Sequence, residues 1–213
     1  MPRREHARFC SPECRVRWNR EHLTDAAAEE RALEWSLAGM RDVIERLRLC
    51  RPEEDGVVAF SAVAEAVWWV TIIDARLIRQ YMDVYDVILA GHPPAQQPAI
   101  EGTLAGLRFV RNQMRDAQDR FVRPPAPGGD GAPGGDGEAT TTVAWVWREV
   151  PELVLEVLPA DVQAWELSRY EAYETWLAGR TVGEVFQRAT AFLNLAATRT
   201  VVAAGDGASS VCS

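Results

Sequence analysis

The sequence predicts an all-α protein, a bundle of five or six helices with a small N-terminal arm and a loop rich in glycine and proline. Apolar residues recur at three- and four-residue steps over most of the chain, which is the period of a helix buried on one side. The alternation typical of a strand occurs in one short stretch only. The composition, 47% hydrophobic and 25% charged, is that of an ordinary globular protein.

Charge is distributed unevenly along the 213 residues. Residues 1–22 contain six Arg and three Glu and carry +3, so the remainder carries −11 because the whole chain carries −8. An acidic body repels nucleic acid, whereas a basic arm can contact it. No apolar signal segment is visible at the start, so the sequence predicts a cytoplasmic protein with reduced cysteines.

The arm, residues 1–23, concentrates residues that bind metals. Their spacing is His6-x3-Cys10-x3-Cys14-x7-His22. Two thiolates and two imidazoles can complete the tetrahedral shell of a structural zinc ion. Such a site would contribute about 10 kcal/mol to ordering a segment that is too short to build a hydrophobic core. The sequence therefore predicts zinc as a cofactor of this arm.

The motif FCSPECR in the arm resembles the second half of FCS-type, zinc-ribbon or treble-clef fingers. Cys10 and Cys14 correspond to the second ligand pair of these fingers, and Arg15 corresponds to the basic residue that follows the pair. The upstream C-x2-C pair of these fingers is absent here. Three explanations stay open: His6 and His22 replace that pair, the true start lies upstream, or the finger is a relic that binds no metal.

The same resemblance implies that the arm contacts nucleic acid or a protein. Arg15, Arg17 and Arg20 follow the motif and could meet phosphates. The alternative interpretation of these residues is a solvated charged face. As a whole, the chain also resembles helical proteins of actinobacteria, in keeping with a composition in which all 23 basic residues are arginine. That likeness implies no mechanism.

The helical bundle is predicted at residues 24–122. Thr24 and Asp25 are suitable N-cap residues for a helix that ends near Leu49. The helix with the widest apolar face follows over residues 60–81, and the other helices should surround it.

Glu65 and Asp74 interrupt this apolar face, which makes the 60–81 helix too short and too charged to span a bilayer. We expect Asp74 on the flank of the helix, either paired or exposed at the rim. A short helical turn and a surface loop with His92 precede a third helix over residues 95–116. The predicted buried stripes of the three helices are Leu33, Leu37, Met40, Ile44 and Leu47; Val63, Val67, Val70, Ile73 and Leu77; and Ile100, Leu104, Leu107, Val110 and Met114.

The third helix contains a second resemblance. Arg111 and Asn112 resemble the start of the HEPN ribonuclease motif, R-[polar]-x3–5-H, in which Arg and His act on the RNA backbone. The histidine of that motif would fall at residues 116–118, where the chain has Asp-Ala-Gln. Without an imidazole the site lacks an obvious acid–base group, so the motif is either degenerate or a chance match.

Residues 123–140 are predicted to form a flexible linker. The hexapeptide APGGDG occurs twice there, and no large apolar residue offsets the entropy lost on ordering. Residues 141–202 are predicted to pack on the bundle as an extended segment and a helical hairpin. Val143, Trp145 and Trp147 alternate with other residues as in a strand, but no partner strand is evident.

The hairpin joins a helix over residues 160–178 to the last helix of the chain. Gly179 ends the first of these helices, and Thr181-x-x-Glu184 forms a capping box that opens the second. Residues 203–213 are predicted to be a disordered tail. The predicted stripes are Trp165, Ala172 and Trp176 in the first helix, with Tyr170, Tyr173 and Leu177 beside them, and Val182, Phe186, Ala189, Leu193 and Ala196 in the second.

These patterns favour a non-enzymatic binding or regulatory protein. The chain contains no Gly-rich phosphate loop and no HExxH or GxSxG motif. Residues 6–22 would contact nucleic acid or a protein, and the body would supply a scaffold or a homo-oligomer interface. No membrane is expected among the partners. The alternatives are a HEPN-like ribonuclease relative, active or degenerate, of a toxin or antiphage system, and a structural bundle whose arm binds nothing.

Overall fold

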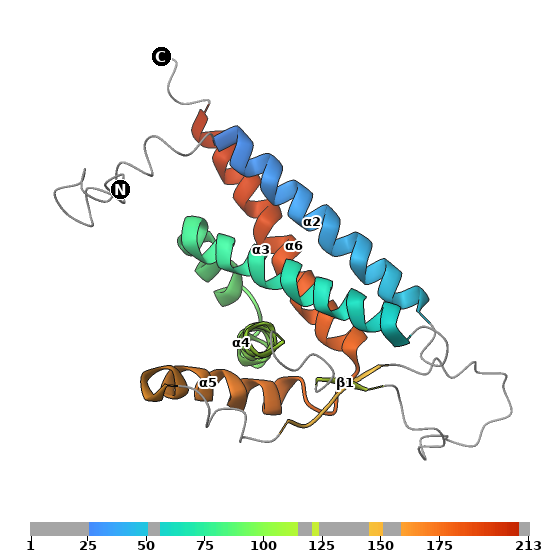
Figure 1. The fold of residues 1–213 in the computed structure, drawn as a ribbon. Helices are drawn as coiled ribbons and strands as arrows, with labels where there is room; N and C mark the ends of the chain where they lie inside the picture. Colours follow the sequence, from blue (N-terminus) through green and yellow to red (C-terminus); the bar gives the residue numbers. More distant parts are fainter. Residues whose placement is uncertain (1–25, 51–55, 115–120, 124–144, 151–158, 209–213) are drawn as a thin grey trace, which may run out of the picture. The chain divides into compact units, whose positions relative to one another are not determined.

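The computed structural model describes most of the helical part of the chain (Figure 1). The predicted zinc arm and most of the Gly/Pro linker lie outside the described residues, so the predictions about them stay predictions. The chain divides into two compact units, residues 1–35 and 36–213. The described part of the first unit is the beginning of one helix, and the packing reported below is that of the second unit. The described residues are 26–50, 56–114, 121–123, 145–150 and 159–208.

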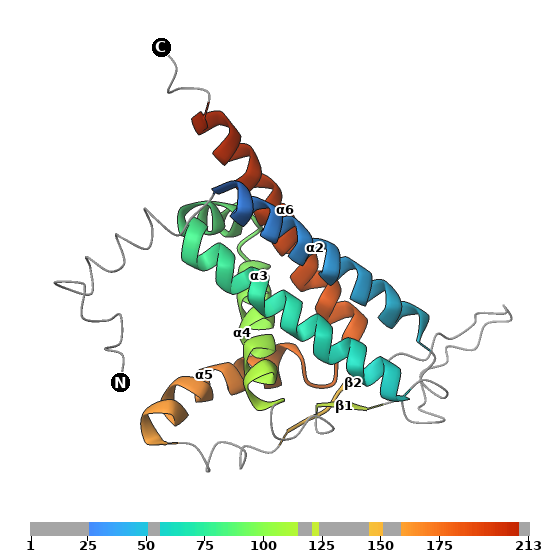
Figure 2. The same ribbon diagram turned by 45° about the horizontal axis from the view of Figure 1, so that its top comes forward.

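Five helices and two short strands are present in the described residues, which confirms the predicted all-α bundle (Figures 1 and 2). The helices are α2 (Ala26–Leu49), α3 (Gly56–Ala90), α4 (Gln97–Gln113), α5 (Ala160–Trp176) and α6 (Val182–Ala208), and the strands are β1 (Val122–Arg123) and β2 (Val146–Trp147). α3 packs against α4 and α6, and α4 also packs against α5 and α6.

α4 is buried on more than one side. All five residues of its predicted stripe are buried, and so are Thr103, Gly106 and Phe109. Gly106 permits the close approach of α5, because a Cβ at this position would lie 2.7 Å from Leu177 and 3.0 Å from the backbone of Tyr173. The stripe and this glycine together place α4 at the centre of the α3–α4–α5 packing.

α3 is longer than the sequence predicts. It runs over 35 residues and includes the helical turn expected as a separate element, with non-helical backbone at Tyr81 (φ −138°, ψ 39°) near the expected break. By length and apolar composition alone this helix could cross a membrane, contrary to the expectation for residues 60–81. Its packing against α4 and α6 and the full burial of Asp74 are features of a core helix.

The buried stripe of α2 differs in part from the prediction. Met40 and Leu47 are buried as expected, but Leu37 and Ile44 are only half-buried. Val43 is fully buried in place of Ile44. Val43 and Ile44 both fit steps of three and four residues between Met40 and Leu47, so spacing alone does not decide which of them faces inward.

The extended segment has a partner that the sequence did not reveal. β2 pairs with β1 in an antiparallel two-stranded sheet. Trp145 and Trp147 are buried whereas Arg148 is exposed, as the alternation predicts. The backbone N–H of Trp147 donates to the carbonyl of Arg180 at 3.0 Å, which holds β2 beside the turn between α5 and α6. Two residues are too few for β1 to leave a periodic signal.

The turn of the hairpin forms as predicted. Gly179 has a positive φ of 74°, which is the conformation expected of a residue that follows a helix end. Thr181 Oγ1 accepts a hydrogen bond from the backbone N–H of Glu184 at 3.2 Å, and the Glu184 carboxylate accepts one from the backbone N–H of Thr181 at 3.2 Å. The predicted capping box is therefore confirmed, and the whole predicted stripe of α6 is buried.

The predicted buried face of α5 is wrong at Trp165, which is 60% exposed. Ala172 and Trp176 are half-buried, and Tyr173 and Leu177, which were predicted beside this stripe, are fully buried. Glu166, next to Trp165, takes the inward position because it has polar partners on α4 and α5. The end of α6 also differs, since the helix continues to Ala208, into the segment predicted to be a disordered tail.

Candidate functional site

A group of charged and polar side chains joins α3, α4 and α5, and we call it the polar cluster. Charged side chains that are taken out of water require partners, because burial removes their hydration. The cluster is therefore the strongest candidate for a functional site in the described residues. Its members are Asp74 and Tyr85 of α3, Arg108 and Asn112 of α4, and Glu166 and Arg169 of α5.

Asp74 connects α3 to α4. Its side chain is 1% exposed. Arg108 Nε donates a hydrogen bond to Asp74 Oδ2 at 2.6 Å, and a second guanidinium nitrogen forms an ion pair with the same oxygen. The Tyr85 hydroxyl donates to the other oxygen, Oδ1, at 3.1 Å. Both carboxylate oxygens are thus bonded, one by a neighbouring helix and one by the far part of α3.

Glu166 connects α5 to α4. Its side chain is 3% exposed, and its Oε1 accepts a hydrogen bond from Arg169 Nη1 at 2.9 Å. The same oxygen accepts a hydrogen bond from Asn112 Nδ2 at 2.7 Å. Glu166 Oε2 is buried and has no hydrogen-bond partner among the described residues. The two bonds on Oε1 explain why a carboxylate occupies the buried face of α5.

Burial shifts the pKa values of three cluster residues. It raises the pKa of Asp74, and the adjacent Arg108 guanidinium opposes that shift. Burial also raises the pKa of Tyr85, and the negative charge of Asp74 raises it further, so the phenol keeps the proton that it donates. Burial lowers the pKa of Arg169, and Glu166 opposes that change. For Asp74 and Arg169, a partner of opposite charge offsets part of the cost of burial.

Two arginine–tryptophan pairs lie beside the cluster. The guanidinium carbon of Arg111 is 4.7 Å from the ring centroid of Trp68, and that of Arg169 is 3.5 Å from the ring centroid of Trp165. Trp68 is 50% exposed and Trp165 is 60% exposed. A cation over an exposed aromatic ring contributes about 0.5–1 kcal/mol. Each pair therefore holds a guanidinium against a ring that solvent reaches.

The two residues that resemble the HEPN motif have different partners. Arg111 stacks on Trp68, and Asn112 donates its amide hydrogen to Glu166. The position expected for the histidine of the motif, residues 116–118, lies outside the described residues. Both side chains of the motif thus make contacts between helices.

Sequence reasoning missed Arg108, Glu166 and Arg169. The available signal was Asp74, because a carboxylate within a wide apolar face requires a buried cationic partner. That signal does not identify the partner, since Arg108 is 34 residues away in the chain. The sequence contains no signal for Glu166, because the large apolar side chain of its neighbour Trp165 suggested that Trp165 faces the core.

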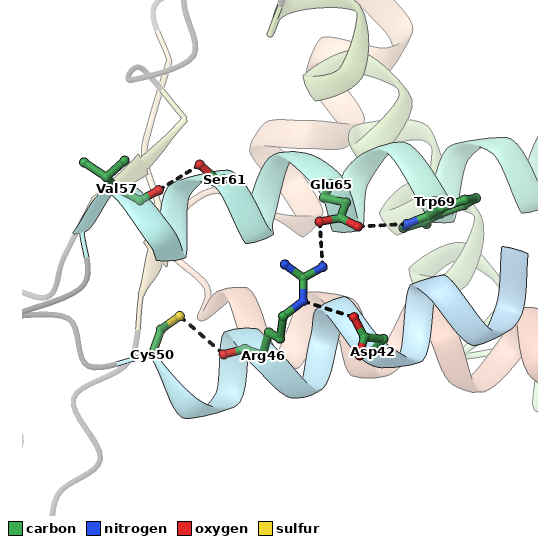
Figure 3. A network of polar contacts seen from close by, with 7 residues as sticks. All are labelled: Asp42, Arg46, Cys50, Val57, Ser61, Glu65 and Trp69. Carbon is green, nitrogen blue, oxygen red and sulfur yellow. Dashed lines mark hydrogen bonds and ion pairs between the residues drawn. The ribbon is translucent and has the colours of Figure 1, made fainter.

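A second network joins α2 to α3 (Figure 3). Its charged side chains are more exposed than those of the polar cluster. Arg46 Nη2 forms a 2.6 Å ion pair with Glu65 Oε2, and Arg46 Nε forms a 3.1 Å ion pair with Asp42. The other oxygen of Glu65 accepts a hydrogen bond from Trp69 Nε1 at 3.3 Å. Glu65 and Asp74 therefore serve separate helix contacts and do not form a pair of carboxylates.

Comparisons with known proteins add no family to these observations. The chain matches no protein-family model, no curated protein and no solved structure.

The predicted metal ligands and the arginines beside them lie outside the described residues. Within the described ranges, no group of three or more His, Cys, Asp or Glu side chains is placed to hold a metal ion. His92 is the histidine that these ranges contain, and it is half-buried rather than on the surface as predicted. Its ring lies 5.9 Å from that of Phe192, and it lines a pocket of about 590 Å³ with Asp83 and Arg199.

Proposed function

We propose that this protein is a non-enzymatic binding or regulatory protein. In this proposal the helical body is a rigid scaffold, and residues 6–22 contact nucleic acid or a protein partner after zinc has ordered them. The ligands would be His6, Cys10, Cys14 and His22, whose two thiolates and two imidazoles suit zinc. Bound zinc would supply folding free energy to the arm.

The observation that carries the scaffold role is the pairing of the polar cluster across helices. Arg108 is bonded to Asp74, and Glu166 is bonded to both Arg169 and Asn112. Charges that are buried and paired in this way hold helices in one arrangement, because separating them leaves an uncompensated charge. A body of this kind is suited to presenting an arm to a partner.

The ribonuclease alternative has less support. An active HEPN site needs Arg and a polar neighbour free to meet RNA, but Arg111 is stacked on Trp68 and Asn112 is bonded to Glu166. A histidine is also missing from residues 116–118. The role that fits Arg111 and Asn112 better is to hold α4 against its neighbours.

Charge favours nucleic acid over a protein as the partner of the arm. The arm carries +3 on 22 residues, and the remaining −11 would keep the body away from phosphates. Arg15, Arg17 and Arg20 would make the phosphate contacts. Binding through three phosphate contacts would weaken steeply with salt, with a slope of log K against log salt of about −2 to −3.

Zinc content tests the ordering of the arm. Purified protein is expected to contain about one zinc per chain, and Cys10→Ser with Cys14→Ser should remove it. Cys50→Ser is the matched control, because Cys50 lies in the body at the end of α2 and should leave the zinc content unchanged. Less than about 0.2 zinc per chain would contradict the metal site.

Fluorescence anisotropy with labelled single-stranded RNA and duplex DNA tests the partner. Replacing Arg15, Arg17 and Arg20 with Ala should abolish binding and its salt dependence, whereas Arg79→Ala, on the exposed side of α3, should not. Zinc-loaded protein that binds neither nucleic acid would point to a protein partner. RNA cleavage that Arg111→Ala abolishes would overturn the proposal in favour of the ribonuclease.

A further inference from the structure

A pocket of about 370 Å³ opens between the end of α2, Trp145 just before β2, and the first turns of α6. We infer that it binds a small amphipathic molecule with an apolar body and an anionic head group, of the medium-chain fatty acid type. The volume lies within the range of pockets that hold small organic ligands. This inference does not depend on the proposed zinc arm, because every residue used below belongs to the body.

The inner wall of the pocket is apolar. Leu47, Trp145, Val182 and Phe186 line it, and all four are buried. Two aromatic and two aliphatic side chains would remove the apolar body of a ligand from water, which is the main source of affinity in pockets of this kind.

Polar side chains also line the pocket, and among its described lining residues the charged one is an arginine. Arg48 and Gln187 line it and are exposed. No Asp or Glu is among the described residues that line the pocket. The Arg48 guanidinium lies 3.5 Å from Glu45, and these two side chains are 67% and 62% exposed, so the pair is weak. A ligand carboxylate would give Arg48 a second partner beside an apolar wall, where ion pairs are stronger than in open water.

One lining position is a glycine with free space around it. Gly183 lines it from the first turn of α6, and a Cβ at this position would meet no atom within 4 Å. At Gly39 and Gly106, by contrast, a Cβ would lie within 3 Å of a neighbouring side chain. Helix packing therefore does not require glycine at this position, and a side chain there would have room beside the pocket.

Isothermal titration of the full chain with decanoate and with decanol, both below their aggregation limits, tests the inference. The two probes share an apolar chain and differ in the charge of the head group. We expect both to bind, and decanoate to bind about fivefold more tightly at low salt, the effect expected of one partly exposed ion pair. Arg48→Gln should remove the preference for decanoate and leave the affinity for decanol unchanged.

Gly183→Leu is expected to abolish binding of both probes by filling the pocket. The variant should fold, since its Cβ has free space and leucine is a better helix former than glycine. Gln187→Trp is a second blocking variant. Ala191→Leu is the matched control, because Ala191 is exposed on α6 and does not line the pocket, so the same added side chain should not affect binding.

Three outcomes would overturn the inference. Wild-type protein that binds neither probe contradicts a ligand pocket. Equal binding by the wild type and the folded Gly183→Leu variant places the probe elsewhere on the protein. Equal affinity for decanoate and decanol, unchanged by Arg48→Gln, contradicts the anionic head group. Removal of zinc should change none of these results, so they are separable from a failure of the proposed arm.

Discussion

The α3–α4 contact and the α2–α3 contact contain the same kind of ion pair in different surroundings. Arg108 and Asp74 join α3 to α4, with side chains 28% and 1% exposed. Arg46 and Glu65 join α2 to α3, with side chains 48% and 42% exposed. An exposed pair contributes little because water and salt screen it, whereas breaking a buried pair leaves a charge without hydration. Burial, rather than the ion pair itself, therefore decides how much each contact contributes to stability.

The α4–α5 and α2–α3 contacts also differ in how closely a glycine lets the helices approach. A Cβ at Gly106 of α4 would lie 3.0 Å from the backbone of Tyr173 in α5. A Cβ at Gly39 of α2 would lie 2.8 Å from the ring of Trp69, which is a half-buried side chain. The ring can turn aside, but the helix backbone cannot. The α4–α5 contact is therefore the less tolerant of the two.

The largest expected effect comes from removing one partner of the buried ion pair. Asp74→Ala should lower the free energy of unfolding by about 3 kcal/mol, because Arg108 keeps its charge and loses its partner. Glu65→Ala should lower it by less than about 1 kcal/mol. Urea unfolding followed by the fluorescence of the eight tryptophans measures both.

Asp74→Asn is the control for shape, since it keeps an acceptor for Tyr85 and removes the charge. Its decrease in free energy of unfolding should lie between those of Asp74→Ala and Glu65→Ala. Equal losses for Asp74→Ala and Glu65→Ala would break the comparison, because burial would then make no difference.

The next effect separates the two glycines. Gly106→Ala should cost about 1–3 kcal/mol, the range for overpacking against atoms that cannot move. Gly39→Ala should cost less, since the Trp69 ring can shift and alanine favours a helix. Thermal unfolding of the two variants beside Gly183→Ala, which adds the same methyl group in open space, tests this order. A larger loss at Gly39 than at Gly106 would contradict it.

The pH dependence of stability gives a third test of burial. In the folded chain the pKa of Asp74 is raised above its ordinary value of 3.8. At a pH between the ordinary and the raised pKa, the folded chain therefore binds more protons than the unfolded chain. The stability of the wild type relative to Asp74→Asn should therefore fall as the pH rises through that window. Urea midpoints of both proteins across acid to neutral pH measure the difference. A relative stability that rises with pH would contradict a raised pKa.

The last expected effect is confined to one helix end. Thr181→Ala should cost about 1 kcal/mol by removing the capping box of α6. Hydrogen bonds from Thr181 lower the pKa of Glu184 below 4.5, so the stability that ionised Glu184 adds is present above that pH and is lost as the pH falls through the lowered value. The difference in free energy of unfolding between the wild type and Thr181→Ala should therefore become smaller in acid, opposite in sign to the effect of Asp74. A difference that is independent of pH would show that the Glu184 carboxylate does not contribute to the cap.

The sequence predicted the parts of the fold that depend on neighbours along the chain. The stripes of α4 and α6 and the alternation around Trp147 follow from spacings of two to four residues. The face of α5 was wrong because Trp165 suggested burial, whereas Glu166 is the residue that has partners. Of the candidate site, the sequence identified Asp74 as a charge within the apolar helix and Asn112 as a polar residue of interest. It did not identify the bond that joins Asn112 to Glu166.

By itself, the sequence determined that the chain forms helices, where most of them begin and end, and which residues of α4 and α6 face inward. Only the tertiary structure decided that Asp74 meets Arg108 and that Glu166 meets Asn112, across 34 and 54 residues of chain. The spacing of apolar residues that identifies a helix can be read within a few residues of its own sequence. The partner of a buried charge depends instead on how helices far apart in the chain pack, and that packing produces no repeating pattern in the sequence.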